Sequence, residues 1–536
     1  MALVDEIVSR FEKLANERYT WESHWQEIAE YVLPRKAEIT VRRTPGEKRT
    51  RNLYDTTAIR ANQILAAGLH GYLTSPGTPW FTLRLQDYDL MQRSRDVKLW
   101  LKDAEKKIMA VLNFSNFNSQ IHELYLDLGA FGTACMYEEE DPVRVVRFDT
   151  RPISEIYIAE NANGVVDTVF RKFIMTARQA YQRWGRDAGE AVAKALEKNK
   201  PEEKFEFLHA VFPREDFHPG KAGAKNMPWA SVYIELSSRH LISEKGYEEF
   251  PYFVPRWLKS SSEIYGRSPA MTALPDIKMV NEMAKTIIKA AQKVVDPPVV
   301  LPHDGFLLPL KLTPGGINYR TSPNPNDRVE PLITGANIPV GLNYKEVRRQ
   351  AIREAFFVDL FLMLAQRKAE MTATEVLERV EEKMIILGPT LGRLMAELLT
   401  PIITRTFNIL SRKGIIAPPP PELEGQEYIV EYVSPLARAQ RAAEVGAITR
   451  LFLTVTPLVQ IQPEVVDNID GDRIIRHVAD AIGAPPEILR SDDEVQALRQ
   501  QRMQMMQQQQ VTEDIEKAVK VAKEASQVKG IEELIG

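Results

Sequence analysis

Two amphipathic helices on either side of a proline-rich stretch constrain the fold of this 536-residue chain more than any other feature. Residues 276–295 repeat apolar side chains at helical spacing, and two prolines follow them. Residues 299–342 are rich in Pro, Gly and Asn. A second helix is predicted from an N-cap at Asn343 to about Leu364. The two helices are therefore expected to run antiparallel, side by side, with the intervening stretch at their tip.

The rest of the chain predicts a predominantly helical α+β protein. Apolar residues at helical spacing, bounded by proline and glycine, indicate helices, and short β-branched or aromatic segments between turn residues indicate strands. Helices are expected at 3–33, 57–72, 93–112, 116–128 and near 176–197, and strands at 134–139, 143–148, 155–159, 165–174, 204–212 and 231–237.

A short break and a long helix follow the second central helix. Residues 365–371 interrupt the helical pattern, and residues 372–375 have the sequence of a capping box. The helical pattern then continues until Gly414 stops it. Pro389 and Pro401 lie inside this stretch, so kinks are expected. A proline linker, one strand at 428–433 and a mostly helical C-terminal region come after it.

Charge and cysteine content limit the function. The net charge is −4 and the isoelectric point is about 6.2, whereas sequence-specific DNA-binding proteins are usually basic. A transient contact with DNA is still compatible with this net charge, because a protein along which DNA slides would be hindered by many strong phosphate contacts. Cys135 is the only cysteine, so neither an intramolecular disulfide nor a multi-thiolate zinc site is expected. We find no secretion signal and no apolar run of about 18 residues, so no membrane partner is expected.

The common signatures of catalysis are absent from the sequence. The motifs GxxxxGK[ST], GxGxxG and GxSxG do not occur. Asp467, Asp470 and Asp472 lack the full spacing of a calcium loop, so one of them is expected to cap the following helix. Residues 138–141, all acidic, are expected to form a solvated turn. Zinc-ligand spacing is missing among His70, His122, His209, His240 and His477. The sequence therefore predicts no enzymatic activity, no cofactor and no metal.

Two groups of cations are candidates for interaction. Lys278, Lys285, Lys289 and Lys293 lie near one side of the first central helix, opposite its apolar face, although a solvated helix face has the same pattern. Gln366, Arg367 and Lys368 lie in the short break, where a plain polar loop is the alternative. In a ring of identical subunits, one such loop per subunit would form a belt of positive charge.

Six segments together resemble the head-to-tail connector, or portal, family of T7-like short-tailed bacteriophages. Each segment is weak alone, but their order and spacing are specific. They are TWESHWQEIAEYVLPR (20–35), LYDTTAIRANQILAAGLHGYLTSPGTPWFTL (53–83), LYLDLGAFGTACMYEEED (124–141), PYFVPRWLKSSSEIYGRSPAMTALPDIKMVNEM (251–283), PGGINYR (314–320) and MTATEVLERVEEKMIILGPTLGRL (371–394).

The resemblance implies the portal architecture of wing, stem, clip and crown, assembled as a ring around a central channel. It places Gln366, Arg367 and Lys368 in the loop that lines the narrowest part of the channel, and makes the four lysines channel or inter-subunit residues. The implied parts are a wing (1–266), a first stem helix (267–296), a clip (297–342), a second stem helix (343–364), a tunnel loop (365–371), a long kinked wing helix with a linker strand (372–434), a crown (435–500) and a Gln-rich, then helical, tail (501–536).

The implied function is that of a conduit at the unique capsid vertex, through which double-stranded DNA is packaged and ejected. The implied partners are further copies in a ring, typically of twelve, the major capsid and scaffolding proteins, the terminase large subunit, tail adaptor or tail tube proteins, and DNA bound without sequence preference. The protein would assemble in the host cytoplasm and reside in the virion. Two alternatives stay open: a metal-dependent nucleic-acid-processing enzyme, and a tail or baseplate structural protein.

Overall fold

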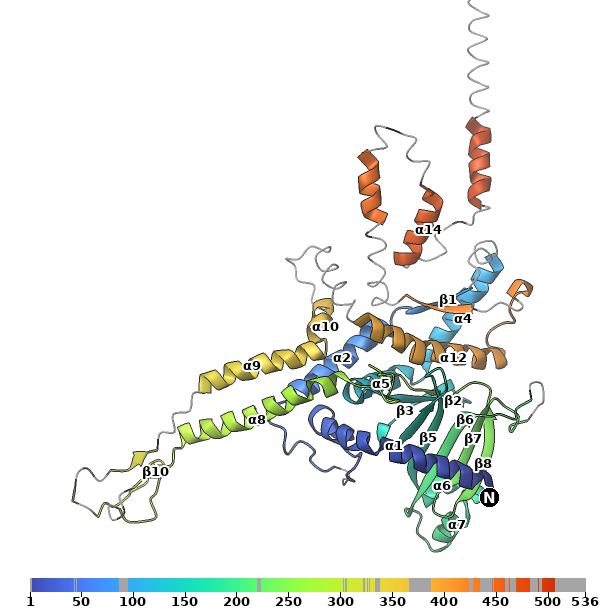
Figure 1. Cartoon of the computed structure of the whole chain (residues 1–536). Coiled ribbons are helices and arrows are strands. Elements are labelled where there is room, and N and C mark those ends of the chain that lie inside the picture. The colour runs from blue at the N-terminus through green and yellow to red at the C-terminus, as the bar shows by residue number, and fades with distance from the viewer. Residues whose placement is uncertain are drawn as a thin grey trace, which may run out of the picture. The chain divides into compact units, whose positions relative to one another are not determined.

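The computed structural model divides the chain into two compact units, residues 1–78 with 108–410 and residues 79–107 with 411–536 (Figure 1). Helices and antiparallel sheets occur together, so the predicted α+β class is confirmed. The structure describes all residues except 1, 43, 45, 86–94, 219–222, 302, 304–305, 322, 325, 327, 333–337, 366–386, 424–427, 434–445, 447, 458–461, 463–468, 483–489, 491–493 and 507–536.

An antiparallel five-stranded sheet is central to the first unit. Its strands lie in chain order, so consecutive strands pair with each other. They are β4 (Ile156–Glu160), β5 (Val166–Thr176), β6 (Lys204–Pro213), β7 (Trp229–Glu235) and β8 (His240–Tyr247). The sequence predicted the first four of these strands. It missed β8 because the residues Ser-Glu-Lys-Gly interrupt its apolar pattern.

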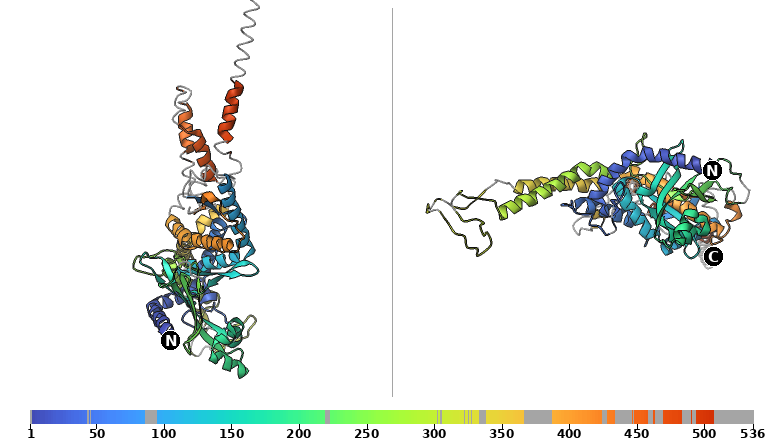
Figure 2. Two further views of the ribbon diagram at one scale, coloured as in Figure 1. Left: turned by 90° about the vertical axis from the view of Figure 1, so that its right-hand side faces the viewer. Right: turned by 90° about the horizontal axis from the view of Figure 1, so that it is seen from below.

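Helix α1 (Ala2–Val32) covers one face of this sheet (Figure 2). Its apolar side chains recur at helical spacing and pack on Phe170, Leu208 and their neighbours. Each fully buried side chain of this size contributes about 1.5–3 kcal/mol. Arg18 is also buried, and its guanidinium donates to the carbonyl of Ile153 at 2.9 Å and lies 3.7 Å from the ring centre of Tyr157.

Two short helices cover the opposite face, where the sequence predicted one helix. They are α6 (Ala177–Trp184) and α7 (Glu190–Glu197), joined by the 3-10 turn Gly185–Ala188. Thr176 and Gln179 form a capping box at the start of α6. The small residues of both helices pack on Phe173 and Phe207 of the sheet.

A second, three-stranded sheet in the order β3-β2-β9 packs with a pair of helices. Its strands are β2 (Cys135–Asp141), β3 (Val145–Arg151) and β9 (Tyr252–Phe253), and the helices are α2 (Thr57–Leu73) and α5 (Phe117–Phe131). The buried Asn62 amide of α2 donates to the carbonyl of Leu126 in α5 at 3.0 Å. A Cβ at Gly129 would collide with the Asn62 side chain, so glycine permits this close approach.

The two central helices, α8 (Pro269–Val295) and α9 (Ile338–Ala355), lie side by side and run antiparallel (Figure 1). Helix α8 begins seven residues before the predicted start, because the Ser268 hydroxyl caps it by accepting from Met271 N at 3.0 Å and the helix runs through Pro275. The predicted N-cap at Asn343 is wrong, since that residue lies inside α9. In the intervening stretch, β10 (Val299–Val300) pairs with β11 (Glu330–Pro331).

The second central helix ends earlier than predicted. Phe357 has a left-handed backbone, with φ +57°, and separates α9 from α10 (Val358–Ala365). The prediction of one helix continuing to Leu364 is therefore wrong. The sequence could not show this break, because the apolar pattern continues through Phe357. None of the described helices combines the length and the apolar character needed to cross a bilayer.

A long helix is described from residue 387 and passes through both Pro389 and Pro401. It widens into a π-helical turn at Met395–Leu399 and continues as α12 (Thr400–Arg412). Pro401 is the second residue after the π turn. A proline has no N–H to donate to the preceding turn and crowds a carbonyl of that turn, and a widened turn accommodates both effects. Gly414, with φ +70°, follows the end of the helix as the sequence predicted.

In the second unit, β1 (Phe81–Leu85) pairs with β12 (Tyr428–Tyr432), and residues 95–107 of α4 (Arg95–Phe114) place Glu105 against β1. Helix α14 (Gly471–Ile482) begins after Asp470, whose carboxylate accepts from Arg473 N at 3.1 Å. This confirms that one of the three aspartates caps a helix rather than completing a calcium loop.

The acidic run on β2 is not the solvated turn that we expected. Glu138 is fully buried, and its carboxylate accepts a hydrogen bond from the Thr406 hydroxyl of α12 at 2.9 Å. Its second oxygen lies 3.7 Å from Arg405 Nε, too far for a hydrogen bond. The expectation failed because the sequence of a strand does not show which helix, far along the chain, will cover its side chains.

Burial raises the pKa of Glu138 to about 7, although Arg405 and Thr406 oppose the shift. An unfolded glutamate titrates near about 4.3. Folding therefore takes up a proton, so this group's stabilisation is complete below about pH 4.3 and is lost as the pH rises through about 7. We expect Glu138→Gln to remove about 3 kcal/mol of pH dependence from the free energy of unfolding. Urea unfolding at fixed protein concentration between pH 5 and 8 tests this, with Glu140→Gln as the control; equal pH slopes in all three proteins would contradict it.

Candidate functional site

The predicted tunnel-loop residues Gln366, Arg367 and Lys368 lie outside the described residues. The structure does describe both flanks of that segment, α10 before it and the helix from residue 387 after it. The described part of the candidate site therefore consists of the residues that hold these two flanks in place and of the lysines of α8.

A close contact with α2 holds the flank before the segment. A Cβ on Gly68 would collide with the ring of Phe361 in α10, so the bare backbone of Gly68 provides the space for that ring. Phe361 is buried, and its ring stacks on Tyr72 at 6.3 Å. Helix α10 is thus packed directly on α2.

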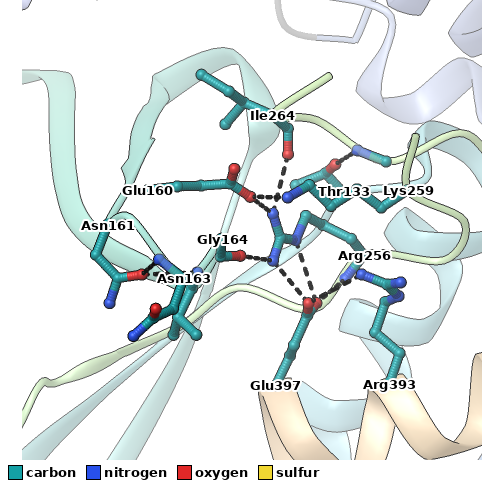
Figure 3. A network of polar contacts seen from close by, with 12 residues as sticks. Thr133, Glu160, Asn161, Asn163, Gly164, Arg256, Lys259, Ile264, Arg393 and Glu397 are labelled. Carbon is teal, nitrogen blue, oxygen red and sulfur yellow. Dashed lines mark hydrogen bonds and ion pairs between the residues drawn. The ribbon is translucent and has the colours of Figure 1, made fainter. Parts of the chain in front are cut away.

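A buried arginine holds the flank after the segment (Figure 3). The guanidinium of Arg256 donates to both carboxylate oxygens of Glu397, at 2.6 and 3.2 Å, from the π turn. The backbone N–H of Arg256 donates to the same carboxylate at 2.9 Å. Arg393, one turn earlier on the helix, is a further partner of Glu397 at 3.3 Å.

The remaining donors of Arg256 bind the turn between β4 and β5 and the chain around residue 264. They donate to the Glu160 carboxylate, to the Gly164 carbonyl at 3.0 Å and to the Ile264 carbonyl at 3.2 Å. All five guanidinium N–H groups therefore have partners, as a charge that is 1% exposed requires. Lys259 adds a second cation to Glu160 at 2.6 Å. Arg256 thus links the helix that contains Glu397 to the five-stranded sheet.

The four lysines of α8 fall into two classes. Lys278 pairs with Glu27 of α1 at 2.5 Å, and Lys285 lies 3.5 Å from Glu282 on its own helix. Lys289 and Lys293 are exposed and have no ion-pair partner within the part of the chain that the structure describes. Their positive charges are therefore the ones in this row that remain available to an external partner.

Ion pairs fix α9 against its surroundings. Arg348 pairs with Asp276 of α8 at 3.1 Å, and Arg349 pairs with the buried Asp55 carboxylate, just before α2, at 2.5 Å. Burial alone would raise the pKa of Asp55, but hydrogen bonds from Thr57 and Arg349 lower it below its usual range. The base of the helix pair is thus held by charge-assisted bonds rather than by apolar packing alone.

The helix pair also exposes apolar side chains that a lone soluble subunit would be expected to bury. Val295 at the end of α8 is 85% exposed. Others on the pair are Met279, Ile288, Val294, Val340, Leu342 and Val347. These exposed apolar side chains on the same two helices are candidates for contacts with another subunit.

His209, His70 and His122 lie among ordinary protein groups. His209 is buried between the hydroxyls of Tyr252 and Ser231, at 2.8 and 3.0 Å, and burial next to Arg171 lowers its pKa well below the usual value. His70 and His122 lie with ring centres 5.8 Å apart. Over the described ranges, no three His, Cys, Asp or Glu residues come together as a metal site would need.

The sequence analysis missed Arg256, Glu397 and Asn281, which hold the helices around the candidate site. Arg256 and Glu397 are 141 residues apart in the chain, so no local pattern could have paired them. Asn281 left one signal: it is a polar residue in a stripe that is otherwise apolar, between Ile277 and Ala284.

Comparisons with known proteins point in one direction. The sequence matches the family described as "Bacteriophage head to tail connecting protein" over residues 4–489. It is 36% identical over 505 residues to the "Probable portal protein" of Bordetella phage BPP-1, covering 92% of this chain and 90% of that protein. It is 33% identical over 505 residues to the "Portal protein" of Salmonella phage epsilon15, covering 93% and 91%. Among solved structures, a chain of the neck of an empty GTA particle aligns with TM-score 0.37 and 10% identity, covering 86% of this chain and 100% of that chain.

Proposed function

The chain belongs to the bacteriophage head to tail connecting protein family, and from this premise we propose that it forms a ring through which double-stranded DNA enters and leaves the capsid. Proteins of this family are structural components of the virion and not enzymes. Family membership sets aside both alternatives, the metal-dependent nucleic-acid-processing enzyme and the tail or baseplate protein.

The observation that carries the proposal is the antiparallel pair α8 and α9 with its exposed apolar side chains. Copies arranged around an axis would bury these side chains against neighbouring subunits, and a heterologous contact that closes on itself gives a ring. In this arrangement α8 and α9 are the stem, and residues 1–266 are the wing. Because α9 already begins at Ile338, the clip is the stretch between the two helices and ends before the predicted residue 342. Residues 435–500 are the crown.

The ring would multiply the cations that each subunit contributes to the channel. Lys289 and Lys293 on the stem, and Arg367 and Lys368 in the tunnel loop, would repeat around the axis as belts of positive charge. Such belts contact the phosphate backbone without reading sequence, and a small number of contacts per subunit allows DNA to slide.

A conduit without enzymatic activity needs partners that supply energy and complete the particle. The terminase large subunit would dock on the clip and supply the energy for packaging, and tail adaptor or tail tube proteins would take its place afterwards. Capsid and scaffolding proteins would surround the ring during assembly in the host cytoplasm. The mature ring would reside at one vertex of the virion.

The mass of the purified full-length protein at micromolar concentration tests the proposal, together with a negative-stain image down the symmetry axis. We expect a large cyclic oligomer with a central hole, typically of twelve subunits. Ile288→Asp places a charge on the exposed apolar surface of α8 and should convert rings into folded monomers, because burying an unpaired carboxylate is costly.

The matched control is Val143→Asp, which makes the same change at an exposed site in the β2–β3 turn. It should leave the ring intact. A wild-type protein that stays a stable monomer, or an Ile288→Asp protein that still forms rings, would contradict the proposal or its stem interface, respectively.

A further inference from the structure

The segment between α1 and α2 concentrates positive charge in a chain that is acidic overall. Residues 35–51 contain seven basic and two acidic residues, whereas the whole chain carries −4. A concentration of this kind on an irregular segment is typical of a surface that binds a polyanion.

Four of these cations pair with acidic side chains of the same chain. Lys36 pairs with the buried Asp127 at 2.5 Å and Arg35 with Glu123 at 2.7 Å. Arg42 pairs with Glu206 at 3.2 Å, and Arg49 pairs with Glu38. Of the remaining three cations, Arg43 lies outside the described residues, and Lys48 and Arg51 lie at the far end of the segment.

Lys48 and Arg51 are exposed, and neither has an ion-pair partner in the described part of the chain. Unpaired exposed cations are common on protein surfaces, so exposure alone does not identify a site. Their position relative to α8 is the second observation.

Asn281 of α8 fixes the end of the segment beside the lysine row. Its side chain is 3% exposed; the amide donates to the Asn52 carbonyl at 3.0 Å, and its oxygen accepts from Tyr54 N at 2.7 Å. Lys285, one turn further along α8, lies 5.7 Å from the ring centre of Tyr54. The residue directly before this clamp is Arg51, so the end of the segment lies against α8 beside Lys285, one and two turns before Lys289 and Lys293.

We propose that Lys48 and Arg51, together with Lys289 and Lys293, form one surface that binds the phosphate backbone of duplex DNA; this rests on the proposed function. The cations follow a helix and the segment clamped to it, rather than surrounding a pocket. Lys289 and Lys293 are about 6 Å apart along the axis. A row of separated point charges suits a long, uniform polyanion, and lysine contacts phosphate without the fixed geometry that reads a base.

The test measures binding of a fluorescein-labelled 25-bp duplex to the assembled wild-type protein by anisotropy, between 50 and 200 mM NaCl. Two double variants, Lys48→Ala with Arg51→Ala and Lys289→Ala with Lys293→Ala, remove the two halves of the surface. Each lost phosphate contact should weaken binding about eightfold at 0.1 M salt and lower the salt slope by about 0.9. The control, Lys198→Ala with Lys200→Ala, removes two exposed cations from the turn after α7 and should bind as wild type.

The oligomer mass of each variant is measured in parallel, which separates the possible failures. If Lys48→Ala with Arg51→Ala binds DNA with wild-type affinity and slope, the inference is overturned while the ring stands. If that variant loses its ring, the two cations hold a neighbouring acidic subunit surface, and the inference is again overturned. A wild-type protein that forms no ring overturns the proposed function itself.

Discussion

Replacement of Arg256 by Met is expected to lower the free energy of unfolding by about 3–5 kcal/mol. Methionine fills much of the space of the arginine side chain but donates no hydrogen bonds. The carboxylates of Glu160 and Glu397 are 15% and 18% exposed, and both lose their principal partner. Leaving buried charges without a partner costs more than removing a whole ion pair.

Urea unfolding at fixed protein concentration measures the change, because ring formation would itself add to apparent stability. Arg178→Met is the matched control: Arg178 is 55% exposed and pairs with the exposed Glu202 at 3.4 Å, so its loss should cost about 0–1 kcal/mol. An Arg256→Met protein within about 1 kcal/mol of wild type would show that solvent or Lys259 and Arg393 can replace the lost donors.

Replacement of both Arg367 and Lys368 by Ala is expected to leave ring assembly intact and to reduce the DNA retained in heads. In a ring of twelve, the double variant removes about two dozen positive charges from the proposed tunnel loop, and rings of charge at a constriction control what passes. We expect roughly a tenfold loss of full-length packaged genomes, equivalent to about 1.4 kcal/mol in retention. Genome length in purified particles and the fraction of filled heads are the measurements.

Two controls separate charge from shape at this position. The exchange Arg367→Lys with Lys368→Arg keeps both charges and should package as wild type. Lys198→Ala with Lys200→Ala removes the same number of charges from an exposed turn and should have no effect. Unchanged genome length and head stability in the double alanine variant would exclude a gating role for these residues.

The fold was predictable where periodicity is local and long. The sequence predicted α1 and α2 to within one or two residues, because their apolar stripes run for several turns and end at turn residues. It could not predict the break at Phe357, which depends on one left-handed residue. It also misplaced the start of α9: Asn343 is a favourable capping residue, but the helix begins five residues before it, at Ile338.

The sequence predicted which residues of the candidate site are charged, but not which of these charges lack an ion-pair partner. The spacing of the four α8 lysines indicated a common side of the helix. Their pairing state depends on acids elsewhere, and Glu27, the partner of Lys278, lies 251 residues away in the chain. Gln366, Arg367 and Lys368 remain a prediction, and so do the boundaries of the wing, stem, clip and crown.

The π turn at Met395–Leu399 sets the phase of the helix that contains it. A π turn holds about one residue more than an α turn, and one residue corresponds to about 100° of rotation. This offset lets Glu397 meet Arg256 while Arg405 and Thr406, further along, still lie against Glu138. Deleting a single residue here would restore a regular helix and turn its second half away from β2. The number of residues in this turn is therefore constrained as well as the identity of Glu397 within it.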